Sequence, residues 1–326
     1  MVRKIFLGIV LVVVVFIAGF AAFVASRQHL KFVAPDMAVA ASTDSTVIAR
    51  GHYIVRRVTN CAGCHGDTTK SAALLAGEDV PLCGGYVFDI PPGKFCPRNI
   101  TPDNETGIGT FTDKQLAQAL RYGIGHDGRA LLPFMELQGL SDEDIVAVIS
   151  YLRSQRPVHN LVPAHQPNVL GRVVMATVLA KPVGPKEPPL HVSPHGATTE
   201  NGRYLVEYVA LCGSCHTERN RATGQFTGPK FGGARDFENN GKVSWSPPNI
   251  TADAQTGRLG KLTEDEFVAR FRAGRTLPDS PMPWQGFSKM DEDDLRAIYR
   301  YLKSVPPVTN DVGPAMAPVA AKKGNG

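Results

Sequence analysis

Two short segments of the sequence combine a pair of thiols with an adjacent imidazole. Residues 61–65 read Cys-Ala-Gly-Cys-His, and residues 212–216 read Cys-Gly-Ser-Cys-His. At this spacing the two thiols can add to the two vinyl groups of a porphyrin, while the next residue turns its imidazole onto the iron. A redox dithiol or half of a zinc site would use the cysteines but would not need the histidine. The pattern therefore predicts two covalently bound haem c groups, held by Cys61, Cys64, His65, Cys212, Cys215 and His216.

A haem bound in this way keeps one axial position free, and two methionines are the candidates to fill it. Met135 in LLPFMELQG and Met282 in PDSPMPWQG share the pattern Met-x-x-Gln-Gly, and each follows a stretch that contains proline. A thioether paired with His favours ferrous iron and closes the iron to outside molecules, which is typical of electron-transfer centres. We therefore predict His65 and Met135 as the metal ligands of the first site, and His216 and Met282 as those of the second.

Other residues offer weaker alternatives for this position. A single methionine more often fills the core, which is the role we expect for Met290. His126 could ligate the first iron, but the second copy has no His at that place, and an isolated His is usually a surface group. The same surface role is expected for four further histidines, His159, His165, His191 and His195.

The two remaining cysteines, Cys83 and Cys96, have Phe231 and Ser246 as their counterparts in the second half of the chain. Their joint absence there predicts a disulfide, since haem attachment places the chain in an oxidising compartment where such a bond persists. The alternative is a pair of buried free thiols.

The two Cys-x-x-Cys-His segments belong to a long internal repeat. GHYIVRRVTNCAGCH from Gly51 corresponds to GRYLVEYVALCGSCH from Gly202, an offset of 151 residues. Further along, NITPDNETGIG matches NITADAQTGRLG, and SDEDIVAVISYLRSQRPV matches MDEDDLRAIYRYLKSVPPV. Such self-similarity predicts two copies of one domain, at residues 45–158 and 197–310.

Each copy is expected to contain only helices and loops. A helix leads into the Cys motif, a middle helix follows a turn-rich loop, and a terminal helix follows the Met loop, so the predicted fold class is all-α. Gly51 and Gly202 precede the Cys motifs, where a missing side chain would let the first and last helices of each copy cross closely. Tyr151 and Tyr301 are the expected contacts at these crossings.

A segment without charge, residues 5–25, stands out from the average composition. As a helix it would reach across the hydrocarbon core of a bilayer, so residues 1–30 are predicted to be a single membrane anchor. A cleaved secretory signal has a shorter apolar region with a cleavage site close behind it, and both features fit poorly.

Residues 159–196 are predicted to be a Pro-rich linker whose apolar stretch, 169–180, is too short to span a membrane and packs across one or both domains. Residues 311–326 are predicted to be a disordered tail.

The composition excludes several classes of function. The formal net charge is +5, but Lys and Arg alternate with acidic residues, so no basic stripe indicates nucleic-acid binding. No glycine-rich dinucleotide loop follows a strand, and no nucleophile lies beside a base. The chain is therefore expected to carry electrons for an enzyme rather than to oxidise an organic substrate itself.

The paired haem motifs, the NITPDNETGIG segment and the Met loops make residues 45–310 similar to the membrane-bound cytochrome c subunits of bacterial periplasmic dehydrogenases, such as alcohol, aldehyde and gluconate dehydrogenases. This resemblance implies class I cytochrome c domains that take electrons from a quinoprotein, flavoprotein or molybdoprotein and deliver them to ubiquinone or an oxidase. The best-known members commonly carry three haem motifs and a C-terminal anchor, whereas this chain has two motifs and an N-terminal apolar segment.

The expected function is that of a dihaem cytochrome in the bacterial cytoplasmic membrane, with its haem domains in the periplasm. It would relay electrons from a periplasmic dehydrogenase to the respiratory chain through a quinone, a cytochrome or a terminal oxidase. The alternative is a dihaem cytochrome c peroxidase, which needs one iron that can open a coordination site for peroxide. The two matched methionines argue against it. A haem-based sensor ranks last, because no signalling domain accompanies the motifs.

Overall fold

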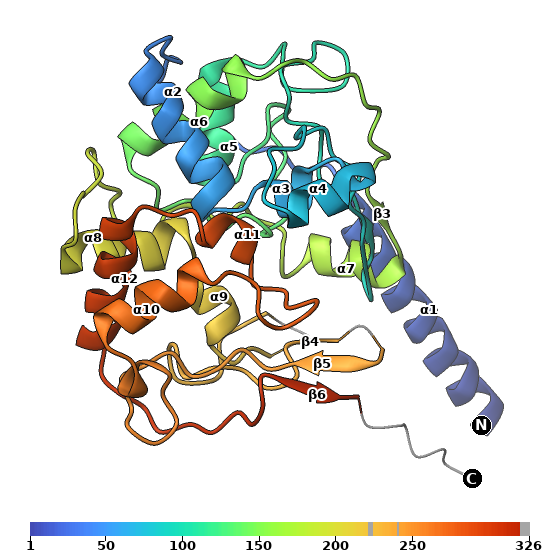
Figure 1. Cartoon of the computed structure of the whole chain (residues 1–326). Coiled ribbons are helices and arrows are strands. Elements are labelled where there is room, and N and C mark those ends of the chain that lie inside the picture. The colour runs from blue at the N-terminus through green and yellow to red at the C-terminus, as the bar shows by residue number, and fades with distance from the viewer. Residues whose placement is uncertain (221–223, 240, 320–326) are drawn as a thin grey trace.

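The N-terminal helix α1 (Val2–Ser26) projects away from the rest of the chain (Figure 1). In this computed structural model, which describes residues 1–220, 224–239 and 241–319, Val24 is the one buried residue of α1. Within those ranges α1 is the one helix that is long and apolar enough to cross a membrane. It contains the apolar run at residues 5–25 and fits the predicted membrane anchor.

Helices form most of the ordered structure in the rest of the described chain, as predicted. They are α2 (Ser45–Tyr53), η1 (Ile54–Val58), α3 (Ala62–His65), η2 (Thr68–Lys70), α4 (Ser71–Leu75), α5 (Asp113–Tyr122), α6 (Asp142–Ser154), α7 (Val169–Ala176), α8 (Thr199–Tyr204), η3 (Leu205–Val209), α9 (Cys212–His216), η4 (Leu259–Lys261), α10 (Glu264–Arg272), α11 (Trp284–Phe287) and α12 (Glu292–Ser304). The strands are β1 (Phe88–Ile90), β2 (Gly93–Phe95), β3 (Gln166–Pro167), β4 (Glu238–Asn239), β5 (Val243–Trp245) and β6 (Met316–Pro318).

The closest helix crossings occur at the two glycines that the repeat brings into register. A Cβ atom added to Gly51 in α2 would lie 1.9 Å from the carbonyl oxygen of Ala147 and 2.7 Å from Cβ of Tyr151, both in α6. A Cβ atom added to Gly202 in α8 would likewise lie 1.9 Å from a carbonyl oxygen of α12 and 2.7 Å from Cβ of Tyr301. The predicted crossings and their tyrosine contacts are confirmed.

The all-α prediction misses two small antiparallel sheets. In one, β2 lies between β1 and β3; in the other, β5 lies between β4 and β6. Each sheet takes a hairpin from the loop after the Cys motif and a third strand from the segment beyond the terminal helix. These strands have only two or three residues, so they cannot display the alternating apolar pattern by which a strand is found in a sequence.

The predicted linker is more ordered than expected. Its residues 166–167 form β3, which pairs with Gly93 and Lys94 of the first half of the chain. Its apolar stretch forms α7, which packs against the end of α1 and against the turn between β1 and β2 of the first repeat. The cause is local, since the Asn168 side chain caps α7 by accepting a hydrogen bond from Gly171 N over 3.0 Å.

The prediction of a disordered tail fails at residues 316–318. This segment forms β6, which pairs with β5 in the register Val243 to Pro318 and Trp245 to Met316. Backbone hydrogen bonds to a neighbouring strand order a segment of low hydrophobicity without requiring a core of its own. Residues 320–326 of the predicted tail lie outside the described residues.

The two halves of the chain contact each other through a reciprocal pair of hydrogen bonds. The Tyr53 hydroxyl of the first half donates to Asp294 over 2.6 Å, and the Tyr204 hydroxyl of the second half donates to Asp144 over 2.7 Å. Asp144 is fully buried and also accepts two hydrogen bonds from the Arg50 guanidinium. Buried apolar residues of both halves belong to one continuous cluster. The two repeats are therefore packed as one body with pseudo-twofold contacts.

Candidate haem-binding sites

Each Cys-x-x-Cys-His segment begins at the same irregular turn of backbone. The first helix of each repeat continues into a π-helical turn, η1 in the first repeat and η3 in the second. A residue in the left-handed region follows each turn: Asn60 and Leu211, both with φ of 54°. Left-handed backbone is unfavourable for a bulky residue such as leucine, and π-helical turns gather at functional sites. The repeated irregularity redirects the chain so that a separate short helix carries each motif, α3 in the first repeat and α9 in the second.

Both motif histidines have one ring nitrogen fixed by a backbone carbonyl. Nδ1 of His65 donates to the oxygen of Arg98 over 2.7 Å, and Nδ1 of His216 donates to the oxygen of Pro248 over 2.8 Å. A carbonyl can only accept, so Nδ1 carries the proton and Nε2 presents its lone pair. Burial lowers the pKa of both imidazoles and favours the neutral form. A neutral imidazole oriented from behind is the state that binds a metal, so the residues fit the iron of a haem.

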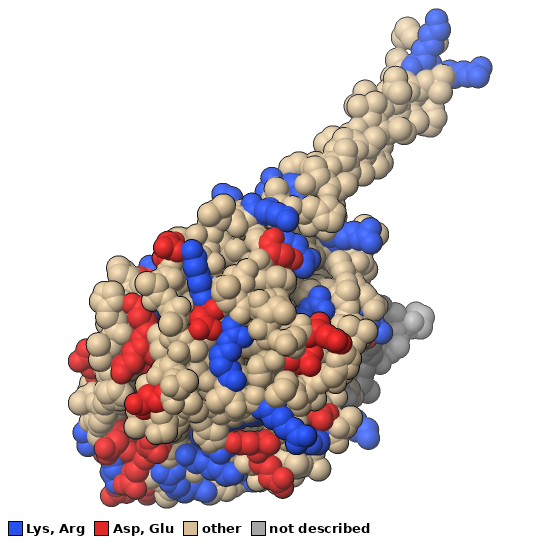
Figure 2. All heavy atoms as spheres, turned by 90° about the horizontal axis from the view of Figure 1, so that it is seen from above, with Lys and Arg blue, Asp and Glu red and all other residues tan. Residues whose placement is uncertain are grey.

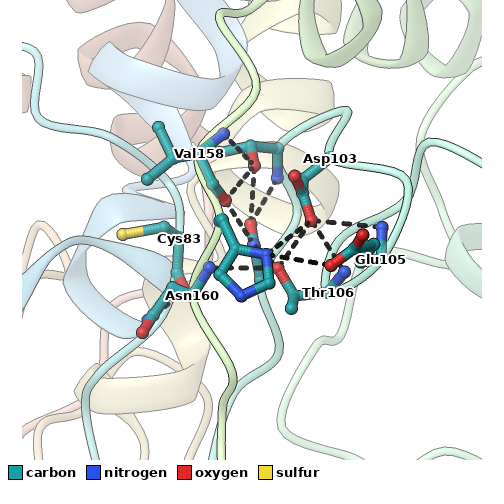
Figure 3. Close-up of polar contacts among 9 residues, drawn as sticks. Cys83, Asp103, Glu105, Thr106, Val158 and Asn160 are labelled. Atoms are coloured by element: carbon teal, nitrogen blue, oxygen red, sulfur yellow. Dashed lines mark hydrogen bonds and ion pairs between the residues drawn. The ribbon is translucent and has the colours of Figure 1, made fainter.

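Arg98, whose carbonyl lies behind His65, is followed directly by Asn99, which belongs to a buried polar network with the residues drawn in Figure 3. Asn99, which is 1% exposed, donates to Thr106 Oγ1 over 3.0 Å and to the Val158 oxygen over 2.8 Å. Its own side-chain oxygen accepts the backbone N–H of Thr101 at 2.9 Å. Asp103 in turn accepts the backbone N–H of Thr106 at 2.7 Å. The network ties the loop that ends in Arg98 to the segment after α6.

The second repeat contains the same network at the corresponding Asn, Thr and Asp residues. Asn249 donates to Thr256 Oγ1 over 3.0 Å and to the Val308 oxygen over 2.7 Å. Asp253 accepts the backbone N–H of Thr256 at 2.7 Å. The two NIT segments were evidence for the repeat, and no role in the site was predicted for them. The repetition of Asn-Ile-Thr was the signal available in the sequence, and the carbonyl just before each Asn orients the motif histidine.

In each motif one cysteine lies one helical turn before the histidine and the other lies directly before it. Burial raises the pKa of Cys61, and it raises the pKa of Cys212 to about 12. Thr59 Oγ1 lies 3.2 Å from Cys61 Sγ, and it donates to the Ile54 oxygen at 2.8 Å. Two thiols and an imidazole on one helical turn form the donor set that covalent haem attachment needs.

Met135 and Met282 both lie half-buried in the loop before the last helix of their repeat. Gln138 of the shared Met-x-x-Gln-Gly pattern donates to the Met135 oxygen over 2.9 Å. In the second repeat the backbone N–H of Trp284 donates to the Met282 oxygen over 2.8 Å. Local hydrogen bonds therefore fix the backbone of both loops, while axial ligation by their thioethers stays a prediction.

Each Met loop packs against the Cys motif region of the opposite repeat. The Ser214 hydroxyl, inside the second motif, donates to Glu136 over 2.5 Å. A Cβ added to Gly139 would lie 2.0 Å from Cδ1 of Tyr208. In the other direction, a Cβ added to Gly286 would lie 2.9 Å from the oxygen of Arg57, four residues before Cys61. Because each Met loop contacts the other repeat, the two candidate sites lie on either side of one shared interface.

The weaker ligand candidates have other roles in the structure. Met290 is buried in the apolar cluster, as expected for a residue that fills the core. His126 is exposed and stacks on Phe111, with ring centroids 3.9 Å apart.

Cys83 and Cys96 are each 4% exposed and carry free thiols. The structure therefore has two buried free thiols, which was the alternative to the predicted disulfide. The Cys83 thiol lies 3.9 Å from the oxygen of Gly84.

The charged side chains mix on the face of the molecule that Figure 2 shows, where Lys and Arg alternate with Asp and Glu. Several pairs form networks, such as Arg296 with Glu264 and Asp265. No continuous basic stripe crosses this face, which agrees with the sequence analysis.

Comparison with known proteins agrees with the class that the motifs define. Residues 48–156, which include the first motif, match the family model described as cytochrome c. The chain therefore carries a cytochrome c domain, and such a domain binds haem c covalently.

The chain as a whole is similar to cytochrome c subunits of dehydrogenases, which confirms the resemblance inferred from its motifs. It is 31% identical to the fructose dehydrogenase cytochrome subunit of Gluconobacter japonicus, over 83% of this chain and 55% of that protein. It is 30% identical to the cytochrome c subunit of the quinone alcohol dehydrogenase of Gluconobacter oxydans, over 87% of this chain and 60% of that protein. The chain thus spans little more than half the length of these two relatives.

A third relative is closer to this chain in length. The chain is 27% identical to a diheme cytochrome c-type protein of Cereibacter sphaeroides, over 76% of this chain and 82% of that protein. The first two of these relatives are named as cytochrome subunits of dehydrogenases.

Proposed function

We propose that the chain is a dihaem c-type cytochrome, built from two tandem class I cytochrome c domains, that relays electrons from a periplasmic dehydrogenase to a quinone, a cytochrome or a terminal oxidase. The observation that carries the proposal is the duplicated imidazole geometry. In both repeats the Nδ1 atom of the motif histidine is hydrogen-bonded to a carbonyl whose position a buried Asn network fixes. One such site would suit many roles, whereas two matched sites across one interface suit a relay.

The chain's own residues hold the cofactors and limit their chemistry. Bound haem supplies a carrier that takes and gives one electron at a time. Cys61 and Cys64 anchor the first group covalently, and Cys212 and Cys215 anchor the second, so neither can dissociate. His65 and His216 would bind the iron of each group through Nε2. Met135 and Met282 would supply a second ligand to each iron and limit the access of peroxide and oxygen, which would favour electron transfer over ligand chemistry.

We further propose that α1 holds the protein at the cytoplasmic membrane with both haem domains in the periplasm. Thioether formation needs thiols presented to the maturation machinery on the export side. The donor would be a dehydrogenase, because relatives of the chain are named as subunits of dehydrogenases. A quinoprotein, flavoprotein or molybdoprotein is the kind of donor that the resemblance of the motifs implies. Tethering raises the effective concentration of the cytochrome near membrane partners.

The proposed relay predicts a defect in respiration. Deleting the chain should abolish oxygen uptake that depends on the dehydrogenase substrate in isolated membranes, while dehydrogenase activity with an artificial acceptor persists. The partner itself is identified by purifying the full chain in mild detergent and sequencing the chains that accompany it. Oxygen uptake that is unchanged after deletion, with every candidate substrate supplied, would rule out the relay.

The proposed axial ligands predict a selective spectral change. Met135→Ala should abolish the weak iron–sulfur absorption band of one haem only and lower the potential of that haem, and Met282→Ala should do the same for the other. The measurement is a spectroscopic redox titration of each variant. Met290→Ala is the matched control, because it removes a thioether from the core of the second repeat. Unchanged spectra in either ligand variant would assign the ligand elsewhere, and rapid oxidation of the reduced parent protein by hydrogen peroxide would favour the peroxidase alternative.

A further inference from the structure

We propose that α7 lies on the membrane surface, with its exposed apolar side chains in the headgroup layer of the bilayer. This inference extends the anchor function proposed for α1 and rests on it. The residues concerned are Val169 and Leu170 at the start of α7 and Val178 just beyond its end, which we call the α7 patch. They are 80%, 52% and 67% exposed, which is unusual for three apolar residues in one short segment of a folded domain.

The position of α7 relative to α1 sets its depth. Nε of Arg27 donates to the Ala176 oxygen over 2.7 Å, and the Gln28 amide donates to the Arg172 oxygen over 3.0 Å. Arg27 and Gln28 follow the apolar run of α1 by two and three residues, which is roughly 3–5 Å at a rise of 1.5 Å per residue. The headgroup layer is about 5–7 Å thick on each side of the hydrocarbon core. With α1 across the bilayer, α7 therefore lies at the level of the headgroups.

The other end of α7 is fixed to the body of the protein, so the helix cannot swing away. The Asn168 side chain donates to the Pro91 oxygen over 2.8 Å, and its backbone N–H donates to the Pro92 oxygen over 3.0 Å. A Cβ added to Gly171 would lie 2.1 Å from that Pro92 oxygen, so the contact allows no larger residue. The β1–β2 hairpin thereby holds α7 against the end of α1 (Figure 1).

The charges around the patch favour phospholipid over a protein partner. Residues 166–186 contain Arg172, Lys181 and Lys186 but no acidic residue, and residues 26–35 contain Arg27 and Lys31 but no acidic residue. Figure 2 shows several Lys and Arg side chains, with an acidic one beside them, around the place where α1 leaves the body. Apolar side chains flanked by cations fit an anionic lipid surface, in which the former enter the acyl boundary and the latter contact phosphates.

The test places a nitroxide on the full chain in nanodiscs of phosphatidylcholine and phosphatidylglycerol. Val178→Cys is compared with Val192→Cys, because both are valines, with 67% and 68% of their surfaces exposed, and Val192 precedes the distant α8. Val12→Cys in the middle of α1 reports whether the anchor spans the bilayer. Spectra are recorded on ferrous protein, with oxygen as the apolar relaxant and a nickel chelate as the polar one. The unsubstituted chain, treated with the label, controls for Cys83 and Cys96.

We expect the ratio of oxygen to nickel accessibility to be several-fold higher at residue 178 than at residue 192, and highest at residue 12. Leu170→Cys serves as a second site in the patch and should behave like residue 178. If residues 178 and 170 match residue 192 while residue 12 reports lipid, the α7 inference is wrong and the anchor stands. If residue 12 reports water, the anchor fails and the α7 inference fails with it. Shielding of residue 178 from both relaxants would mean that protein covers the patch, which also overturns the proposal.

Discussion

Substituting Cys212 and Cys215 with alanine is expected to halve the haem that stays bound to the chain after acid-acetone extraction, from two groups to one. The thioether bonds form only at paired cysteines, so a chain without the second pair keeps only the group at Cys61 and Cys64. The pyridine haemochrome spectrum, divided by the protein concentration, gives the count. The first motif should remain loaded, because the bonds that fix its histidine lie within its own repeat.

The remaining cysteines provide a matched control for this experiment. Cys83→Ser with Cys96→Ser also removes two thiols, but neither lies in a Cys-x-x-Cys-His segment, so both haem groups should be retained. Two haem groups per chain in the Cys212/Cys215 variant would contradict the second attachment site. Release of all haem from the parent protein by acid-acetone would contradict covalent attachment altogether.

Alanine at Gly51 or Gly202 is expected to destabilise the protein more than an ordinary core substitution does. The added Cβ would lie 1.9 Å from a carbonyl oxygen of the facing helix, so α2 and α6, or α8 and α12, must move apart. We expect a loss of about 3 kcal/mol or more, at the upper end for overpacked cores. At roughly 2–4 °C per kcal/mol, the melting temperature would fall by roughly 6–12 °C, measured by circular dichroism.

Gly184→Ala is the matched control for the glycine substitutions. The nearest atom to its added Cβ, Cδ1 of Tyr122, lies at an ordinary contact distance of 3.7 Å. Alanine also restricts the unfolded chain, so stability should stay the same or rise slightly. If the Gly51→Ala and Gly202→Ala variants have the same melting temperature as the Gly184→Ala variant, the two helix crossings are looser than described.

The sequence by itself determined the features that depend on local patterns. The spacing of two thiols and an imidazole defined both candidate haem motifs, because that chemistry requires neighbouring residues on one turn of chain. The self-similarity at an offset of 151 residues led to the two close helix crossings at Gly51 and Gly202 before any contact was known. The apolar run at residues 5–25 likewise determined α1, since helix length and composition alone mark a membrane span.

The tertiary structure decided what depends on residues that are far apart in the sequence. β3 and β6 are too short to carry a pattern, and they exist because a hairpin from the loop after the Cys motif offers a free edge. The carbonyls of Arg98 and Pro248 have no sequence signature of their own, because any residue supplies a carbonyl and only the fold brings it to the histidine. Each Met loop packs on the other repeat, and α7 packs on the end of α1. These contacts join segments that are far apart in the sequence, so no residue spacing predicts them.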